Sequence, residues 1–244
     1  MAGTDPNSPD AFDENLPGLA ALADPIRRSL YRFVAGEGGS VSREQAAEGV
    51  GVAAHTAKFH LDRLVDEGLL DVQFRRLTGR TGPGAGRPAK LYRRSGREFA
   101  LSLPQRNYDL LSEILVRAVE EAVAGGAPMD EVASRVARDE GRSLGADAAG
   151  RIPDGSSLER LAMGLRPHGY EPRLEDQRMA LENCPFDRVA RDHTELVCGL
   201  NLDFVHGMAT GLGCRDLRVS LEPSPGRCCV SAHKVPLSQP RAGS

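Results

Sequence analysis

The chain has 244 residues, of which 40% are apolar and 27% charged, and it contains no Trp. That length suits one large or two small globular domains, and the absence of a long apolar run excludes a membrane-spanning helix. Because aromatic residues are few, the core must be built mainly from Leu, Val and Ala, which favours helices over an all-β sandwich. We therefore expect a mainly α-helical protein.

The net charge of -3 is unevenly distributed along the chain. Residues 1–16 carry -4, residues 17–106 carry +6 and residues 107–244 carry -5. The acidic start lacks the basic and apolar segments of a signal peptide, so we predict a disordered leader over residues 1–16 and a cytoplasmic protein. The stretch from Val72 to Arg97 holds eight bases and no acid, which favours a nucleic-acid partner over a solvated basic face.

Three helices followed by a hairpin are predicted in this basic part of the chain. The first helix begins after the N-cap Asp24, and the second begins after Ser42, which starts a capping-box pattern. A Gly/Pro/Arg loop separates two strands. The predicted elements are helices over about 25–36, 43–49 and 53–67 and strands over 69–74 and 90–93. This order is typical of a winged helix-turn-helix domain, which we place at residues 17–103.

The helix-turn-helix arrangement places the longer helix in the DNA major groove, where its polar side chains reach base edges. The Arg-rich hairpin would then lie along the phosphate backbone or in the minor groove. The alternative is that these side chains only solvate a helix face and a loop. We predict DNA contacts from His55, Thr56, Lys58, His60, Arg63, Arg76, Arg80, Arg87 and Lys90.

Two sets of motifs resemble known families. Bacterial repressors of the ArsR and DeoR type resemble the chain over residues 18–95, in the motifs LADPIRR (22–28), GVAAHTAKFHLDRLV (51–65) and GRPAKLY (86–92). The iron–sulfur-sensing repressors of the Suf cluster-assembly operon are similar in NCPF (183–186), LVCGLN (196–201) and PGRCCV (225–230). The resemblance implies a cytosolic homodimeric repressor of cluster-assembly genes. Such a repressor binds a palindromic DNA operator, and its DNA affinity depends on a cluster in the C-terminal domain.

The C-terminal half is predicted to be an α+β sensor domain preceded by a long helix. Residues 107–124 carry apolar side chains at coiled-coil spacing, which predicts a linker and dimerisation helix within residues 104–126. Packing inside its own chain is an equally weighted alternative. Further predicted elements are helices over 129–144 and 158–165, a small-residue loop over 145–155 and a hairpin over 170–174 and 178–181. We place the iron–sulfur sensor domain at residues 127–236 and a disordered tail at residues 237–244.

All five cysteines lie in the C-terminal part of the chain: Cys184, Cys198, Cys214, Cys228 and Cys229. In the cytosol they argue against disulfides and for metal or redox chemistry. The gaps contain no CxxC pair, which disfavours a zinc finger and favours a site assembled by tertiary folding. A helix over 195–212 would separate Cys198 from Cys214 by roughly 24 Å, whereas a strand over 216–222 would return Cys228 towards Cys198.

We therefore predict Cys184, Cys198 and Cys228 as thiolate ligands. Cys229 would point to the opposite face of an extended strand and is expected to pack or to shield the site. The fourth position would be taken by His193, Cys229, a small molecule or nothing. Soft thiolates favour an iron–sulfur cluster, 4Fe-4S over 2Fe-2S, with zinc as the alternative.

No nucleophile elbow, phosphate loop or metal-hydrolase helix is present in the sequence, so we expect no enzyme. The main hypothesis is a DNA-binding repressor controlled by an iron–sulfur cluster. One alternative is a winged-helix regulator that senses a small organic ligand or zinc, with incidental cysteines. Another is a redox or metal-storage enzyme that retains a DNA-binding module.

Overall fold

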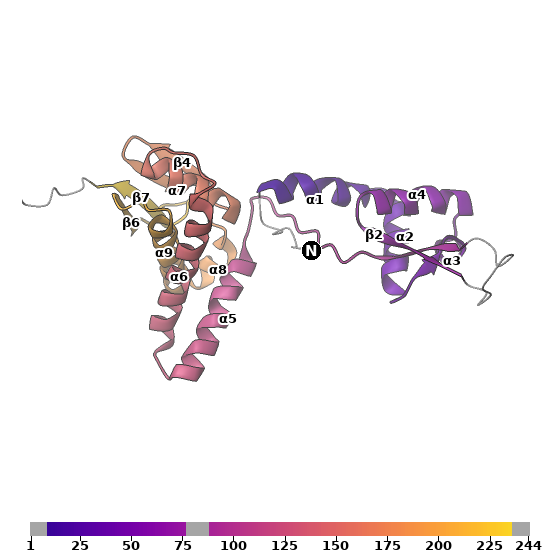
Figure 1. Cartoon of the computed structure of the whole chain (residues 1–244), viewed down its shortest axis with the longest axis horizontal. Coiled ribbons are helices and arrows are strands. Elements are labelled where there is room, and N and C mark those ends of the chain that lie inside the picture. The colour runs from indigo at the N-terminus through magenta and orange to yellow at the C-terminus, as the bar shows by residue number, and fades with distance from the viewer. Residues whose placement is uncertain (1–8, 77–87, 236–244) are drawn as a thin grey trace, which may run out of the picture. The chain divides into compact units, whose positions relative to one another are not determined.

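A computed structural model describes residues 9–76 and 88–235 and divides the chain into two compact units (Figure 1). The boundary lies between Leu101 and Ser102. Each unit has its own hydrophobic core. Within the described ranges no helix combines the length and the apolar character needed to cross a membrane. The tail predicted over residues 237–244 lies outside the described residues.

The N-terminal unit has the helix and strand order of a winged helix. Its strands form an antiparallel sheet in the order β1-β3-β2, and Val72 of β2 lies opposite Tyr92 of β3. The three helices and the hairpin predicted from the sequence are all present. The elements are α1 (Pro9–Ala21), α2 (Pro25–Gly36), β1 (Val41–Ser42), α3 (Arg43–Val50), α4 (Ala54–Asp66), β2 (Leu70–Arg75) and β3 (Ala89–Arg94).

Local signals in the sequence set the ends of these helices. The Asp24 carboxylate accepts a hydrogen bond from the backbone N–H of Arg27 at 2.8 Å and caps α2. Ser42 and Gln45 exchange side-chain and backbone hydrogen bonds in the capping box of α3. Gly51 ends α3 with a positive φ of 73°, a conformation that favours glycine. The chain can therefore turn tightly into α4, as a helix-turn-helix requires.

Helix α1 corrects part of the expectation of a disordered leader over residues 1–16, because the helix begins at Pro9. Asn15 is buried and fixes this helix to the segment after β3. Its side-chain nitrogen donates to the carbonyl oxygen of Ala100 at 3.2 Å, and its side-chain oxygen accepts from Arg97 at 3.3 Å. These contacts join residues more than eighty positions apart, so the local acidic composition gives no sign of them.

The C-terminal unit combines helices with a four-stranded antiparallel sheet in the order β4-β5-β7-β6. The predicted loop over residues 145–155 is wrong in its first part, because α6 continues to Ala149. The elements are α5 (Tyr108–Gly125), α6 (Met129–Ala149), α7 (Ser157–Leu165), the short 3-10 helix η1 (Arg166–His168), β4 (Pro172–Glu175), β5 (Arg178–Leu181), α8 (Asp187–Asp192), α9 (Thr194–Gly211), β6 (Leu217–Leu221) and β7 (Val230–Lys234).

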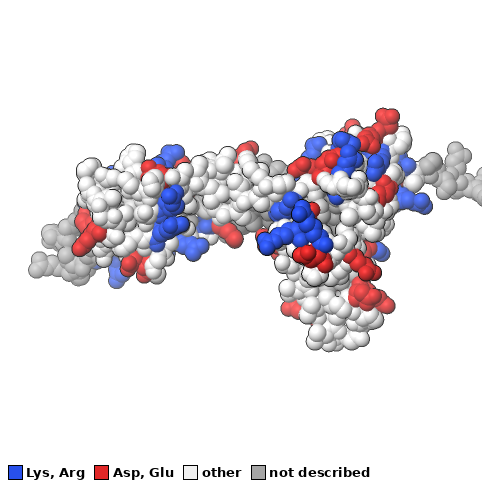
Figure 2. All heavy atoms as spheres, turned by 180° about the vertical axis from the view of Figure 1, so that it is seen from behind, with Lys and Arg blue, Asp and Glu red and all other residues white. Residues whose placement is uncertain are grey.

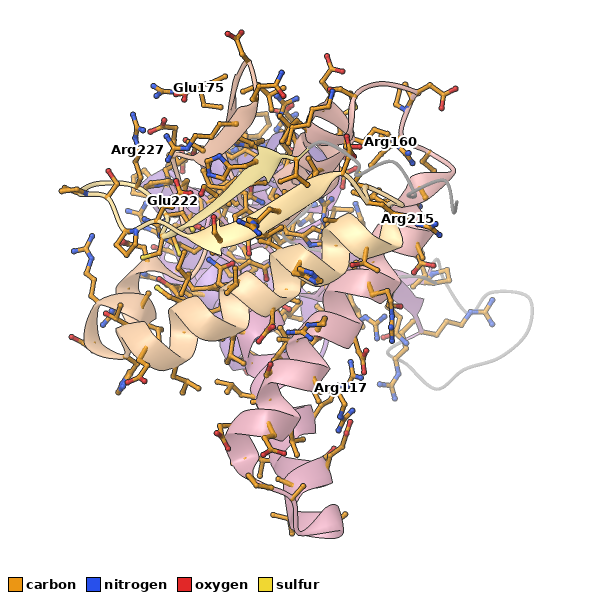
Figure 3. The ribbon with its side chains drawn as sticks, turned by 90° about the vertical axis from the view of Figure 1, so that its left-hand side faces the viewer. Arg117, Arg160, Glu175, Arg215, Glu222 and Arg227 are labelled. Carbon is orange, nitrogen blue, oxygen red and sulfur yellow. The ribbon has the colours of Figure 1, made fainter. Side chains whose placement is uncertain are left out.

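Helices α6 and α9 pack backbone against backbone, with α9 running beneath β6 and β7 (Figure 3). Glycines on both helices permit this close approach. A Cβ placed at Gly207 of α9 would lie 2.0 Å from the carbonyl oxygen of Arg138, and one at Gly141 of α6 would lie 2.0 Å from that of Phe204. Gly145 likewise lies against α9, so this glycine belongs to the packed part of α6 and not to a loop. The packing fixes the position of α9.

Helix α5 has one buried and one exposed apolar face. Leu110, Leu111, Ile114 and Ala118 belong to the core of the C-terminal unit, so the helix packs within its own chain. On the other face Val116, Val119 and Val123 are 57%, 50% and 81% exposed. Their spacing of three and four residues forms a continuous stripe on a helix. Helix α5 therefore packs within its own chain, as the alternative prediction has it. Its second apolar face, with Val116, Val119 and Val123, stays exposed.

Candidate functional site

The outer face of α4 carries most of the helix residues that the sequence predicts to contact DNA. His55, Lys58 and Arg63 are exposed, and Thr56 is partly exposed. His60 differs from the prediction because it is only 8% exposed. It lies one turn before the buried Leu64, and its ring nitrogen is 4.0 Å from the Asp24 carboxylate of α2. His60 is therefore a packing residue of the unit and is not placed to read a base.

Asp62 of α4 accepts three hydrogen bonds, two of which come from strand β3. Its carboxylate accepts from Lys58 at 2.8 Å, from Lys90 at 2.6 Å and from the Tyr92 hydroxyl at 2.9 Å. Partial burial raises the pKa of Asp62, but the three donors outweigh it and lower the pKa to about 2. The two lysines predicted to contact DNA are thus ion-paired within the unit. Lys58 pairs along α4, whereas Lys90 holds the hairpin against α4.

We predict that Asp62→Asn destabilises the protein near neutral pH, by about 0.2–1 kcal/mol for a partly exposed pair. The pKa of Asp62 is lower in the folded chain than the value of about 3.9 in an unfolded one, so its ion pairs contribute stability above that pH. This contribution is lost as pH falls towards 2. Thermal unfolding followed by circular dichroism should therefore show a difference from wild type that shrinks between pH 5 and pH 3.

Asp71→Asn is the matched control, since Asp71 forms a more exposed pair with Arg93 at 3.2 Å. We expect it to change the unfolding temperature less than Asp62→Asn does. An unfolding temperature of the Asp62 variant equal to that of wild type at both pH values would contradict the role given to Asp62.

The hairpin residues predicted to contact DNA are only partly within the described chain. Arg76 is exposed at the end of β2, whereas Arg80 and Arg87 lie outside the described residues. In Figure 2 Lys and Arg side chains form a band on the face of the N-terminal unit that is in view. A hollow of about 500 Å³ on this unit is lined by Arg27, His55, Lys58, Phe59, Asp62, Arg63 and Asp66. No DNA contact is predicted from the sequence for Arg27 or Phe59, although Phe59 lies off the buried stripe of α4.

The C-terminal unit brings four of its five cysteines together from three segments. Cys184 lies in the loop between β5 and α8, Cys198 lies in α9, and Cys228 and Cys229 immediately precede β7. The sulfurs of Cys198 and Cys229 are 3.2 Å apart, and Cys184 forms a side-chain hydrogen bond with Cys228. Figure 3 labels Glu222 and Arg227 in the β6–β7 loop that carries the last two.

The fifth cysteine, Cys214, lies apart from this cluster. It follows the far end of α9, and its thiol is 3.5 Å from the carbonyl oxygen of Ser157. The separation agrees with the expectation from the rise of the helix between Cys198 and Cys214.

Hydrogen-bond donors surround the sulfur of Cys228. The thiol of Cys184 donates to it, the backbone N–H groups of Val230 and Cys229 add two more donors, and the Asn201 side chain donates at 3.2 Å. These donors lower the pKa of Cys228, although burial opposes the shift. The same hydrogen bond, together with burial, raises the pKa of Cys184. Cys228 is therefore the more acidic thiol of this pair.

Asn201 is itself held in position by Tyr170. The buried Tyr170 hydroxyl donates to the side-chain oxygen of Asn201, which leaves the Asn201 nitrogen directed at Cys228. Burial raises the pKa of Tyr170, so its hydroxyl keeps the proton that it donates. This chain of hydrogen bonds connects η1 and β4 to the cysteine cluster through α9.

Cys198 and Cys229 form the second sulfur pair of the cluster. Burial and the hydrogen bond with Cys229 raise the pKa of Cys198 to about 12. His193, the predicted fourth ligand, is exposed at the junction of α8 and α9. Five residues along a helix amount to a rotation of about 140°, so His193 and Cys198 leave α9 in different directions. Among the described residues no three His, Cys, Asp or Glu side chains are arranged to hold a single metal ion.

The loop that carries Cys184 is hydrogen-bonded to the segment just before α5. Arg106 donates to the carbonyl oxygen of Cys184 at 2.9 Å and to the side-chain oxygen of Asn183. The Asn183 nitrogen donates to the carbonyl oxygen of Gln105 at 2.8 Å. In the sequence these residues lie a few positions after Leu101, where the N-terminal unit ends. The cysteine loop is therefore attached to the stretch through which the chain passes from one unit to the other.

Comparison with known proteins agrees with the geometry of the N-terminal unit. Residues 22–73, about a fifth of the chain, match a family of helix-turn-helix domains of the ArsR type. The match spans α2 to β2 and includes the exposed face of α4. No match is found among curated proteins or among solved structures. The fold and this match support a winged-helix transcription regulator and indicate that its N-terminal unit binds DNA.

Proposed function

We propose that the chain is a cytosolic transcriptional repressor whose affinity for a palindromic DNA operator is controlled by an iron–sulfur cluster, 4Fe-4S in preference to 2Fe-2S. The ligands are Cys184, Cys198 and Cys228, and the genes it regulates encode cluster assembly. The observation that carries the proposal is the convergence of four cysteines, two buried and two partly buried, from three segments of the C-terminal unit that lie far apart in the sequence. The protein acts as a regulator and not as an enzyme.

The donor set supports a cluster better than a single ion. Thiolates are the usual ligands of iron–sulfur clusters, and in a 4Fe-4S cluster each binds a different iron, so these ligands need not converge on one point. A zinc site requires such convergence, and the described residues contain no group arranged in that way. The donors around Cys228 favour the thiolate form that any of these metals needs. Cys229, beside Cys198, is a better placed candidate for a fourth ligand than the exposed His193.

Control of DNA affinity would come from bonds between the cluster and thiolates on three segments, which restrain those segments relative to one another. The residues of the chain then carry the effect onwards. Asn201 positions Cys228, and Arg106 attaches the Cys184 loop to the stretch before α5. The C-terminal unit would thus exist in two populations, one with the cluster and one without it. The two populations would present the N-terminal units of the dimer to DNA differently.

Homodimer formation is supported by α5. Its exposed Val116, Val119 and Val123 form an apolar stripe at coiled-coil spacing, and such a stripe is stabilised by a second helix of the same kind. A palindromic operator would match the twofold symmetry of the dimer.

Purification without oxygen tests the presence of the cluster. The visible absorption spectrum and the iron and acid-labile sulfide content of the full chain should show a brown protein with iron and sulfide in comparable amounts. A colourless protein with stoichiometric zinc would overturn the cluster and favour the alternative of a zinc-sensing regulator.

Arg106→Ala should separate cluster binding from its effect on DNA. The variant keeps every cysteine, so it is compared with wild type at equal iron and sulfide content and with the same absorption spectrum. The ratio of operator affinities with and without the cluster, usually 5–150-fold for coupled sites, should fall to less than about twofold. Operator affinity measured with and without the cluster gives this coupling for each protein. Arg135→Ala is the control, because Arg135 pairs with Glu121 on the exposed side of α6. Unchanged coupling in Arg106→Ala would contradict its role.

A further inference from the structure

We propose that Phe59 contacts the methyl group of a thymine in the major groove and thereby determines part of the operator sequence. The inference rests on the proposed function, because it requires α4 to enter the groove. Phe59 is 67% exposed, although it occupies the middle of a helix whose other face forms the core of the unit. Because this ring lies among the residues best placed to contact DNA, we expect DNA to cover its exposed surface.

The surroundings of Phe59 fix where its ring lies. On α4 it stands one turn after His55 and one turn before Arg63, and all three line the same hollow. The ring also packs edge-on against the buried His60 imidazole, with a centroid distance of 5.2 Å and an interplanar angle of 73°. Because His60 is held inside the unit, this contact restricts the ring without covering its outer surface.

Several polar neighbours of Phe59 are already engaged within the unit. Asp62 accepts hydrogen bonds from Lys58 and Lys90, and Arg63 is paired with Glu67 at 2.5 Å. A carboxylate with these partners has little remaining capacity to accept a hydrogen bond from a base. Asp62 is therefore engaged within the unit, and Phe59 is the exposed apolar side chain on this face of α4.

A thymine methyl group fits this ring better than a protein surface does. The C5-methyl group of thymine is the apolar feature of the major groove, and Phe is one of the side chains that contacts it. A protein interface instead needs a larger apolar patch with several buried anchors. The other residues that line the hollow around Phe59 are polar or charged and come from α2 and α4, so the ring is the apolar contact of this lining.

The test begins with the full chain purified without oxygen and a binding site selected from a pool of random duplexes. The selected duplex is then synthesised with deoxyuridine in place of thymidine, which removes the methyl groups and leaves base pairing intact. Wild type should bind the deoxyuridine duplex about fourfold more weakly for each methyl group that is contacted, the loss expected for one apolar carbon.

Two variants assign this loss to its residue. Phe59→Ala should bind the thymidine duplex about as weakly as wild type binds the deoxyuridine duplex and should no longer distinguish the two. Phe74→Ala is the matched control, because Phe74 is 65% exposed on β2 and lies outside α4. This variant should distinguish the duplexes as wild type does. Circular dichroism of Phe59→Ala checks that the variant is folded, and Phe59→Leu, which keeps an apolar contact, should retain part of the discrimination.

The outcomes distinguish failure of the role given to Phe59 from failure of the proposed function. A selected site that wild type binds equally well in both forms would overturn the role of Phe59 and leave DNA binding intact. Discrimination that persists in Phe59→Ala would also overturn it, because another residue would then contact the methyl group. Failure of the full chain to select any site would overturn the proposed function together with this inference.

Discussion

Cys228→Ser is expected to lower the iron and sulfide content of anaerobically purified protein by more than about tenfold, since even indirect changes at metal sites cost 10–100-fold in affinity. Cys228 is the sulfur with the most hydrogen-bond donors, and it lies between the Cys184 loop and α9. Serine retains the size of the side chain but supplies a poor ligand. Iron and sulfide analysis, with the visible spectrum, measures the loss.

Cys214→Ser is the matched control for this substitution. Cys214 is buried to a similar degree, 4% exposed against 5% for Cys228, but it lies at the other end of α9. We expect this variant to retain its iron and sulfide. Cys229→Ser should also retain them if three thiolates suffice. Loss of iron from Cys214→Ser, or retention of iron by Cys228→Ser, would contradict the proposed ligand set.

Gly207→Ala is expected to destabilise the C-terminal unit by about 1–3 kcal/mol, the usual cost of overpacking a close contact. A Cβ at this position would lie 2.0 Å from the Arg138 carbonyl oxygen, so α6 and α9 would have to move apart. Because α9 carries Cys198 and Asn201, such a shift would also disturb the cysteine cluster. Chemical denaturation of the full chain measures the stability.

Gly199→Ala on the same helix is the control, because we expect it to raise the stability of the C-terminal unit. No atom lies within 4 Å of a Cβ at Gly199, so the variant should gain roughly 0.5–1 kcal/mol from the better helix propensity of alanine. Equal effects of the two substitutions would show that the close packing of α6 on α9 does not limit stability.

Much of the fold follows from local signals in the sequence. The caps at Asp24 and Ser42, and the turn at Gly51, predict the helices of the N-terminal unit because each involves residues only a few positions apart. The separation of Cys198 from Cys214 is equally local, since it depends only on the length of α9.

Other features depend on contacts that no local pattern contains. Helix α1 is held by Ala100 and Arg97, and His60 is buried where α4 packs against the rest of the unit, with Asp24 nearby. The expectation that Cys229 points away from the site assumed a strand at this position. Strand β7 begins only at Val230, so alternation does not apply and Cys229 lies beside Cys198. The exposure of Phe59 likewise depends on how α4 packs.

The most direct test of the account is the operator affinity of a single anaerobic preparation before and after removal of its cluster. The duplex is the one selected by the full chain, and the salt concentration is held constant because it strongly affects DNA binding. We predict that the protein with its cluster binds at least about fivefold more tightly, the lower end of typical coupling between sites. Equal affinities in the two states would contradict control of DNA binding by the cluster, whatever metal the cysteines hold.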